Sequence, residues 1–458
     1  MNIILQNYND LLKKMIFDAF SNGLKDELNK IDNNGNVMNY VNLLSGLDES
    51  LCEIARNSLV SIIETLDKSF KNTNQRKRTY DIKSYHSRTI MTIFGEITFN
   101  RYFYNSKLNG KNFCYIDRLL GLHKYDYFDP YIKALIIEYA ANNSYPKVAH
   151  YINNLIGNRV KIDSSFSLIS RQTVRNIILS SNLSYPDIIE LDTPDSLFVI
   201  ADEKWIHTQN NNNQDVMSKS IVLFEGINNK KLVNKMCFTS LDNSFVNNCL
   251  DYIYQVYDTN NIKHIFLMGD GASWIKSLTN ELYINSSVKV IYSLDKFHFK
   301  QALHHITLNK KLEDTLANYI LSNNRKDFIK CCDELKLSFP HRSDIIESKK
   351  IYILNNFNAI NSLYKYNLSC PMESQISHNI ADLFTSRPKA YSINTINKLL
   401  ELRLLYKNKF NLKQLYFNNF NSKDKLTFNN YDLNFSMFDK KDTFSILSKK
   451  ALITLSLS

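Results

Sequence analysis

Glycine, proline and paired cysteines are scarce in this 458-residue chain. Its 10 glycines and 7 prolines exclude collagen-like, glycine-rich and proline-rich proteins. The 7 cysteines form no C-x-x-C pair, and the adjacent Cys331 and Cys332 are poorly spaced to clamp zinc. We therefore expect reduced thiols in a cytoplasmic, nucleoid-associated protein. No run approaches the roughly 18 apolar residues of a membrane span, and residues 1–9 do not resemble a signal peptide.

Positive charge, by contrast, is in excess. Lys and Arg number 56 against 45 for Asp and Glu, a formal net charge of +11. This balance favours a polyanionic partner, most often nucleic acid. A hydrophobic share of 44% in a chain of this length fills the cores of roughly two to four folding units.

The first part of the chain predicts helices followed by a small β element. Apolar residues recur at helical spacing through residues 1–70. Thr89–Phe94 and Glu96–Phe103 then alternate polar and apolar residues around Gly95, which is typical of a β-hairpin. The stretch 71–88 between them is strongly basic. It is either a solvated linker or a contact to the DNA backbone made by Arg76, Lys77, Arg78 and Arg88.

Three further helices are predicted between residues 126 and 190. Tyr131–Ala141 and Lys147–Leu155 have helical periodicity, and Ser170 is a suitable N-cap for a helix running to about residue 180. One interpretation is a helix-turn-helix unit whose last helix lies in a major groove and reads DNA through Arg171, Gln172 and Arg175. The alternative is three amphipathic helices that merely pack together.

From residue 190 the pattern changes to strands. The sequence has five apolar runs, at 196–202, 216–226, 231–240, 264–269 and 288–294. The first three follow one another without a helix, with a polar turn at 227–230, and helices separate the last two. The order βββαβαβα predicts an α/β fold, a mixed five-stranded sheet with helices on its faces, which is the element order of the ribonuclease-H-like fold. Residues 301–368 have no strand signal and are predicted to form an all-helical insertion.

Three carboxylates stand out by position. Asp202 closes the first strand, Asp270 follows the fourth within Gly-Asp-Gly, and Glu373 begins a helical stretch after the insertion. Each alone is most simply the first polar residue of a loop. Together, at one edge of a mixed sheet, they suit two Mg²⁺ or Mn²⁺ ions, since hard cations keep several waters and take one or two carboxylates each. Such a pair of ions activates the attacking oxygen and stabilises the leaving oxygen at a phosphodiester.

Asp295 and His298 occupy the corresponding end of the fifth strand. Asp295 is either an ordinary helix N-cap with an exposed histidine nearby, or the two residues brace the acids through hydrogen bonds.

Several segments together resemble one family, over about residues 80 to 400. They are TIFGEITFNRYFY (92–104), IDRLLGL (116–122), IADEKWIH (200–207), MGDGASWIK (268–276), SLDKFHFKQAL (293–303) and CPMESQISHNIADLFTSRPKAYS (370–392). In these segments the chain resembles bacterial insertion-sequence transposases of a group long catalogued as an uncharacterised protein family, similar in core to Mutator-type DDE transposases. The resemblance implies that Asp202, Asp270 and Glu373 form the catalytic, metal-binding triad. It also matches Asp295 and His298 to a D-x-x-H signature and residues 301–368 to the helical insertion.

The resulting hypothesis is a DDE transposase that cuts the ends of its own element and joins them to target DNA, as a homodimer or higher assembly on DNA and away from membranes. Two alternatives are a ribonuclease-H-like nuclease or resolvase without strand transfer, and an inactive DNA-binding remnant. The predicted organisation is a helical region with a basic linker (1–80), a β-hairpin element (81–125), a helix-turn-helix-like region (126–190), the catalytic core (191–300), the insertion (301–368), the rest of the core (369–410) and a tail (411–458).

Overall fold

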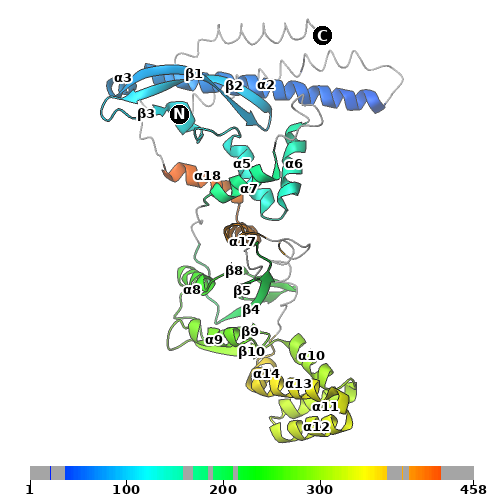
Figure 1. The fold of residues 1–458 in the computed structure, drawn as a ribbon. Helices are drawn as coiled ribbons and strands as arrows, with labels where there is room; N and C mark the ends of the chain where they lie inside the picture. The colour runs from blue at the N-terminus through cyan, green and yellow to red at the C-terminus, as the bar shows by residue number, and fades with distance from the viewer. Residues whose placement is uncertain are drawn as a thin grey trace. The chain divides into compact units, whose positions relative to one another are not determined.

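The computed structural model describes residues 21, 37–157, 169–183, 189–209, 215–368, 384 and 391–423. The chain divides into two compact units (Figure 1). The first unit contains Met1–Ser184 and Leu412–Ser458, and the second contains Tyr185–Asn411. The ranges predicted for the catalytic core and for its helical insertion therefore belong to the same unit.

A long helix and a β-hairpin form the first part of unit one. Helix α2 (Val37–Asn72) is followed by the short α3 (Asn74–Thr79), β1 (Tyr80–Thr92), β2 (Gly95–Ser106), β3 (Asn112–Cys114) and α4 (Tyr115–Leu119). The hairpin around Gly95 is confirmed, with Thr92 opposite Gly95. Strand β1 begins nine residues earlier than predicted, at Tyr80 rather than Thr89. The basic stretch is therefore built into α3 and β1 and does not form a linker.

Helix α2 covers the part of β2 that the short strand β3 leaves unpaired. Carboxylate oxygens of Glu64 and Asp67 accept hydrogen bonds from the backbone N–H groups of Asn100 and Tyr102, at 2.9 and 2.7 Å. These bonds satisfy backbone donors of β2 that lie beyond the reach of β3. The ring of Phe70 stacks on Tyr115 with centroids 4.1 Å apart, and both side chains are buried. The helix and the sheet therefore share one core.

The three helices predicted next are confirmed. They are α5 (Pro130–Ala140), α6 (Tyr145–Gly157) and α7 (Arg171–Ser180), and they pack on one another. Ser170 caps α7 as expected, its side chain accepting from Thr173 N. Residues 158–170 separate α6 from α7, a longer connection than the three- or four-residue turn of a helix-turn-helix. The short connection instead joins α5 to α6. Helix α18 (Leu412–Lys423) returns to pack on α5.

Unit two contains the five-stranded mixed sheet that the sequence predicts. Its strands are β4 (Ser196–Ile206), β5 (Val216–Phe224), β8 (Met236–Ser240), β9 (His264–Gly269) and β10 (Lys289–Leu294), in the spatial order β10-β9-β4-β5-β8. β4, β5 and β8 pair antiparallel, whereas β9 and β10 run parallel to β4. A two-stranded extension, β6 (Gly226–Asn228) with β7 (Lys231–Val233), replaces the simple turn expected between the second and third strands.

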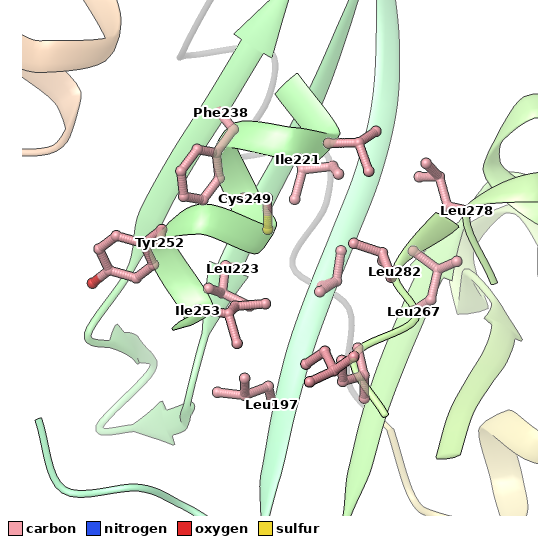
Figure 2. Packing of buried hydrophobic residues seen from close by; sticks show 14 of the residues in the cluster. Leu197, Ile221, Leu223, Phe238, Cys249, Tyr252, Ile253, Leu267, Leu278 and Leu282 are labelled. Carbon is pink, nitrogen blue, oxygen red and sulfur yellow. The ribbon is translucent and has the colours of Figure 1, made fainter. Parts of the chain in front are cut away.

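Helices bury both faces of this sheet. Helices α8 (Ser244–Val256) and α9 (Ser273–Glu281) cover the face that carries Leu197 and Leu267, with Cys249 packed among them (Figure 2). The opposite face, with Ile200 and Phe266, meets α14 (Phe357–Lys365) and α17 (Ile393–Lys407). Each fully buried aliphatic side chain contributes about 1.5–3 kcal/mol to the free energy of folding. Packing on both faces therefore stabilises the sheet.

The insertion is helical throughout its described residues, as predicted. After α10 (Lys296–Ile306) come α11 (Lys310–Leu321), α12 (Arg325–Ser338), the turn η1 (Pro340–Arg342), α13 (Ser343–Asn355) and α14. They enclose a second apolar core that contains Phe299, Phe328 and Phe357. Helix α14 packs on β10, and Phe299 of α10 shares its apolar cluster with Leu294 of β10, so the insertion is anchored at both of its ends. Within the described ranges, no helix combines the length and the apolar character needed to cross a membrane.

Candidate active site at the ends of the parallel strands

Three acidic residues lie where the parallel pairing of β4, β9 and β10 ends. Asp202 does not close its strand as predicted, because β4 continues to Ile206. Asp270 directly follows β9, and Asp295 directly follows β10. The backbone N–H of Asp295 donates to the carbonyl of Gly269 at 2.8 Å, which continues the ladder to the acids. Asp202 lies on β4, two residues beyond the last β4–β9 pair, Ile200 with Met268. The register therefore brings Asp202 alongside Asp270, as the sequence predicts for neighbouring strand ends.

The charges of Asp202 and Asp270 interact. The pKa of Asp202 is raised, chiefly by burial and then by the negative charges of Asp270 and Glu203. A hydrogen bond from Glu203 N to Asp202 Oδ1, 2.8 Å long, opposes this rise in pKa because it favours the charged form. Asp202 is thus a partly buried carboxylate whose pKa is raised by the charge of a second carboxylate, and a bound cation would stabilise both charges.

Asp295 caps α10 and is hydrogen-bonded to His298. The carboxylate of Asp295 accepts from His298 N and lies 2.9 Å from His298 Nδ1, and only 4% of the Asp295 side chain is exposed. The pKa of His298 is raised, first by this hydrogen bond and further by the charges of Asp295, Asp270 and Asp202. The N-cap interpretation is confirmed, because Asp295 caps α10. Bracing of the acids by this pair stays a prediction, since the hydrogen bond at 2.9 Å joins Asp295 to His298.

The donor set fits a divalent cation in part. Asp202 and Asp270 supply two hard oxygen donors with like charge, which is the number that Mg²⁺ takes from a protein while keeping its waters. The third predicted ligand, Glu373, lies outside the described residues. Among the residues that are described, no group of three or more His, Cys, Asp or Glu side chains is arranged to hold a metal ion.

Two hydrogen bonds that sequence patterns do not predict hold the backbone next to Asp202 and Asp270. The indole N–H of Trp274 on α9 donates to the carboxylate of Glu203, which β4 presents on the face opposite Asp202. The hydroxyl of Tyr352 on α13 donates to the backbone carbonyl of Asp270. The alternation of β4 is a local signal that places Glu203 on the α9 face. No local signal identifies Tyr352, because its partner is 82 residues away.

Comparison with known proteins connects this site to a family. Residues 33–416 match the family described as Uncharacterised protein family UPF0236. The chain belongs to the UPF0236 family. Two similar relatives are UPF0236 proteins of Caldanaerobacter subterraneus subsp. tengcongensis. One, whose name joins eleven locus designations, is 24% identical over 429 residues, 90% of this chain and 85% of the relative. Another is 25% identical over 393 residues, 82% of this chain and 81% of the relative.

The predicted DNA-binding residues of this UPF0236 chain differ in exposure. Lys77 and Arg78 on α3 are exposed. Arg76 is half-buried, and its guanidinium donates to the carbonyl of Lys71 at the end of α2. On α7, the side chains of Arg171 and Gln172 are exposed and Arg175 is partly covered.

Arg88 has to be removed from the predicted DNA-binding set. Only 6% of its side chain is exposed, and it pairs with Asp117 at 2.9 Å. It also donates to the carbonyl groups of His123 and Asp126. Arg101 pairs with the same carboxylate at 2.9 Å. The family-like segments 92–104 and 116–122 thus meet in a buried ion cluster, and the position of Arg88 within β1 directs it inward.

Proposed function

We propose that this UPF0236 chain is a DDE-type transposase with a ribonuclease-H-like core, which cleaves the ends of its own DNA element and joins them to a target. One observation carries the proposal: the register of the adjacent parallel strands β4 and β9 brings Asp202 alongside Asp270, and the hydrogen-bonded Asp295–His298 pair follows the next parallel strand. The proposal assigns Glu373 as the third carboxylate, on the resemblance of its segment.

The topology of unit two supports a ribonuclease-H-like assignment. Three antiparallel strands are followed by two strands parallel to the first, and the first strand lies in the middle of the sheet. The acid on the central strand is thereby adjacent to the acid after its parallel neighbour. A metal-dependent site that cleaves a phosphodiester needs such a pair of carboxylates. The all-helical insertion begins at the helix that Asp295 caps, directly after the last strand of the sheet.

The residues of this site have different roles in the proposed reaction. When Mg²⁺ or Mn²⁺ is bound, it supplies the positive charge that activates an attacking oxygen and stabilises the leaving oxygen of the phosphodiester. Asp202 and Asp270 hold that charge in place. Asp295 orients His298, whose raised pKa keeps the imidazole protonated to higher pH than usual and so favours contact with a phosphate.

The surface charge of unit one supports DNA as the partner. Lys77 and Arg78 are exposed on α3, and Arg171 and Gln172 are exposed on α7. The cations Lys77, Arg78 and Arg171 suit phosphates irrespective of sequence, whereas the Gln172 amide suits a base edge in the major groove. Because both ends of an element must be held for joining, the proposal includes a homodimer or a higher assembly on DNA.

The number of loci in the relatives' names is a further support. One relative's name joins eleven locus designations of one organism, and another joins four. A gene that recurs at many loci of one genome is what an element that copies or moves itself produces.

The decisive experiment is Mg²⁺- or Mn²⁺-dependent cleavage of the DNA repeats that flank the gene, followed by joining of pre-cleaved ends to a second duplex. Asp202→Asn is expected to reduce cleavage about a hundredfold or more, because it removes one carboxylate of the pair. Asp195→Asn is the matched control, since Asp195 is exposed at the opposite end of β4 and pairs with Lys263.

Cutting without joining indicates a ribonuclease-H-like nuclease or resolvase. Repeat binding that survives Asp202→Asn, without any metal-dependent cleavage by the wild type, indicates an inactive DNA-binding remnant. Either result contradicts the proposed transposase.

A further inference from the structure

The helical insertion contacts the backbone of the acid loop directly. Tyr352, near the end of α13, donates its hydroxyl proton to the carbonyl of Asp270. Burial, and then the negative charges of Asp270 and Asp295, raise the pKa of Tyr352 far above its usual range. The hydroxyl therefore stays protonated and remains a donor at every physiological pH.

A second residue of the insertion also packs against this loop. Asn356 is 3% exposed, and its side-chain N–H donates to the carbonyl of Tyr352 at 2.8 Å. A Cβ added to Gly271 would meet the Tyr352 ring at 3.1 Å and the Asn356 amide at 3.1–3.3 Å. Gly271 has φ +101°, a conformation that favours glycine. The turn after Asp270 thus has its shape set by glycine and its position set by α13.

The position of this turn also sets the direction of the Asp270 carboxylate. Its Oδ1 accepts from the backbone N–H of Ala272 at 2.9 Å, so the carboxylate is tied to the same turn that Tyr352 and Asn356 contact. A shift of the backbone at 270–271 therefore moves a metal-binding oxygen. The buried cores around α10 and α13 make the insertion a rigid support for this contact.

We infer that Tyr352 is a positioning residue of the insertion, which holds the Asp270 carboxylate in its metal-binding orientation through a hydrogen bond to the Asp270 backbone. The inference rests on the proposed function. It assigns to the insertion a role inside the active site, in addition to any contact with DNA. Asn356 supports the role by packing against Gly271 beside Tyr352 and by donating to the Tyr352 carbonyl.

The test compares Tyr352→Phe with Tyr364→Phe in the full chain. Tyr352→Phe removes one hydroxyl and keeps the ring, whereas Tyr364 is a partly exposed tyrosine on α14 whose ring packs edge-on against Phe299. Two quantities are measured without DNA: the Mn²⁺ dissociation constant by calorimetry, and hydrogen exchange of the amides at 270–272. For Tyr352→Phe we expect Mn²⁺ binding about tenfold weaker and exchange about tenfold faster, because one hydrogen bond of ordinary strength is lost. Tyr364→Phe is expected to leave both unchanged.

The possible failures are distinguishable. If the wild type binds Mn²⁺ and Tyr352→Phe binds it equally well, the inference is wrong and the proposed function stands, even where the melting temperature falls. Wild-type exchange rates at 270–272 in Tyr352→Phe also overturn the inference. If the wild type binds no Mn²⁺, or Asp202→Asn binds it as tightly as the wild type, the proposed function fails and the positioning role fails with it.

Discussion

Trp274 donates its indole N–H to the carboxylate of Glu203, the residue that follows Asp202 on β4. Lys219 lies 5.3 Å above the same indole ring and donates to Asn243. The chain has only 2 tryptophans, and the other, Trp205, is 54% exposed on the same strand. One tryptophan thus anchors the strand that carries the central acid, and the other provides a control.

Trp274→Phe is expected to destabilise unit two by about 1–3 kcal/mol, because the partly buried Glu203 carboxylate loses its donor. Urea denaturation, followed by far-UV circular dichroism, measures this difference. Trp205→Phe should change stability by less than about 0.5 kcal/mol, since the exposed ring has little packing to lose. Equal effects of the two substitutions contradict the anchoring role of Trp274.

Arg88→Ala is expected to destabilise unit one by about 3 kcal/mol or more. The substitution leaves the Asp117 carboxylate, which is 16% exposed, with Arg101 alone, and breaking a buried ion pair from one side is costly. Chemical denaturation measures the change. Arg78→Ala, at an exposed position, serves as the control and should be close to neutral. A neutral Arg88→Ala with weakened DNA binding would restore the original DNA-contact hypothesis.

The double variant Lys77→Gln with Arg78→Gln is expected to bind DNA more weakly without any loss of stability. If both side chains contact phosphates, the slope of log affinity against log salt decreases in magnitude by about 2. Fluorescence anisotropy with a duplex carrying the element's end, titrated with salt, measures the slope. Lys289→Gln removes an exposed lysine at the amino end of β10, away from the acids, and should leave the slope unchanged.

Asp67 is expected to make unit one less stable as the pH rises from about 4 to 6. Burial raises the pKa of this carboxyl from 3.8 to about 6. The folded chain therefore retains a proton that the unfolded chain has already released, and stability decreases through that pH window. The full effect is about 3 kcal/mol, from a pKa difference of about 2.

Asp67→Asn isolates this contribution from those of other carboxyl groups. The asparagine keeps an acceptor for the Tyr102 N–H but does not titrate. The stability difference between the wild type and Asp67→Asn, measured by denaturation from pH 4 to 7, should grow in favour of the variant as the pH rises. A difference that stays constant with pH contradicts the assigned pKa.

The elements that sequence periodicity predicts best are those whose signals are local. β9 begins and ends at the predicted residues, and Ser170 and Asp295 cap the helices expected to follow them. Caps and strand ends depend on a few neighbouring residues, so a single sequence is sufficient to place them. Periodicity does not predict the early start of β1, because its first half is mostly exposed and the register shift between Ile82 and Ser84 breaks the alternation.

The sequence by itself determined the order of the five sheet strands along the chain, the acid that follows β9 and the acid that follows β10, and the excess of positive charge. Only the tertiary structure decided which charged residues are exposed and could contact DNA, and which of the insertion's residues contact the acid loop. Arg88 turns inward to a carboxylate 29 residues later, and Tyr352 reaches back 82 residues to the loop of Asp270. Both contacts arise from the packing of whole elements, and no periodicity within one element encodes the distance between two of them.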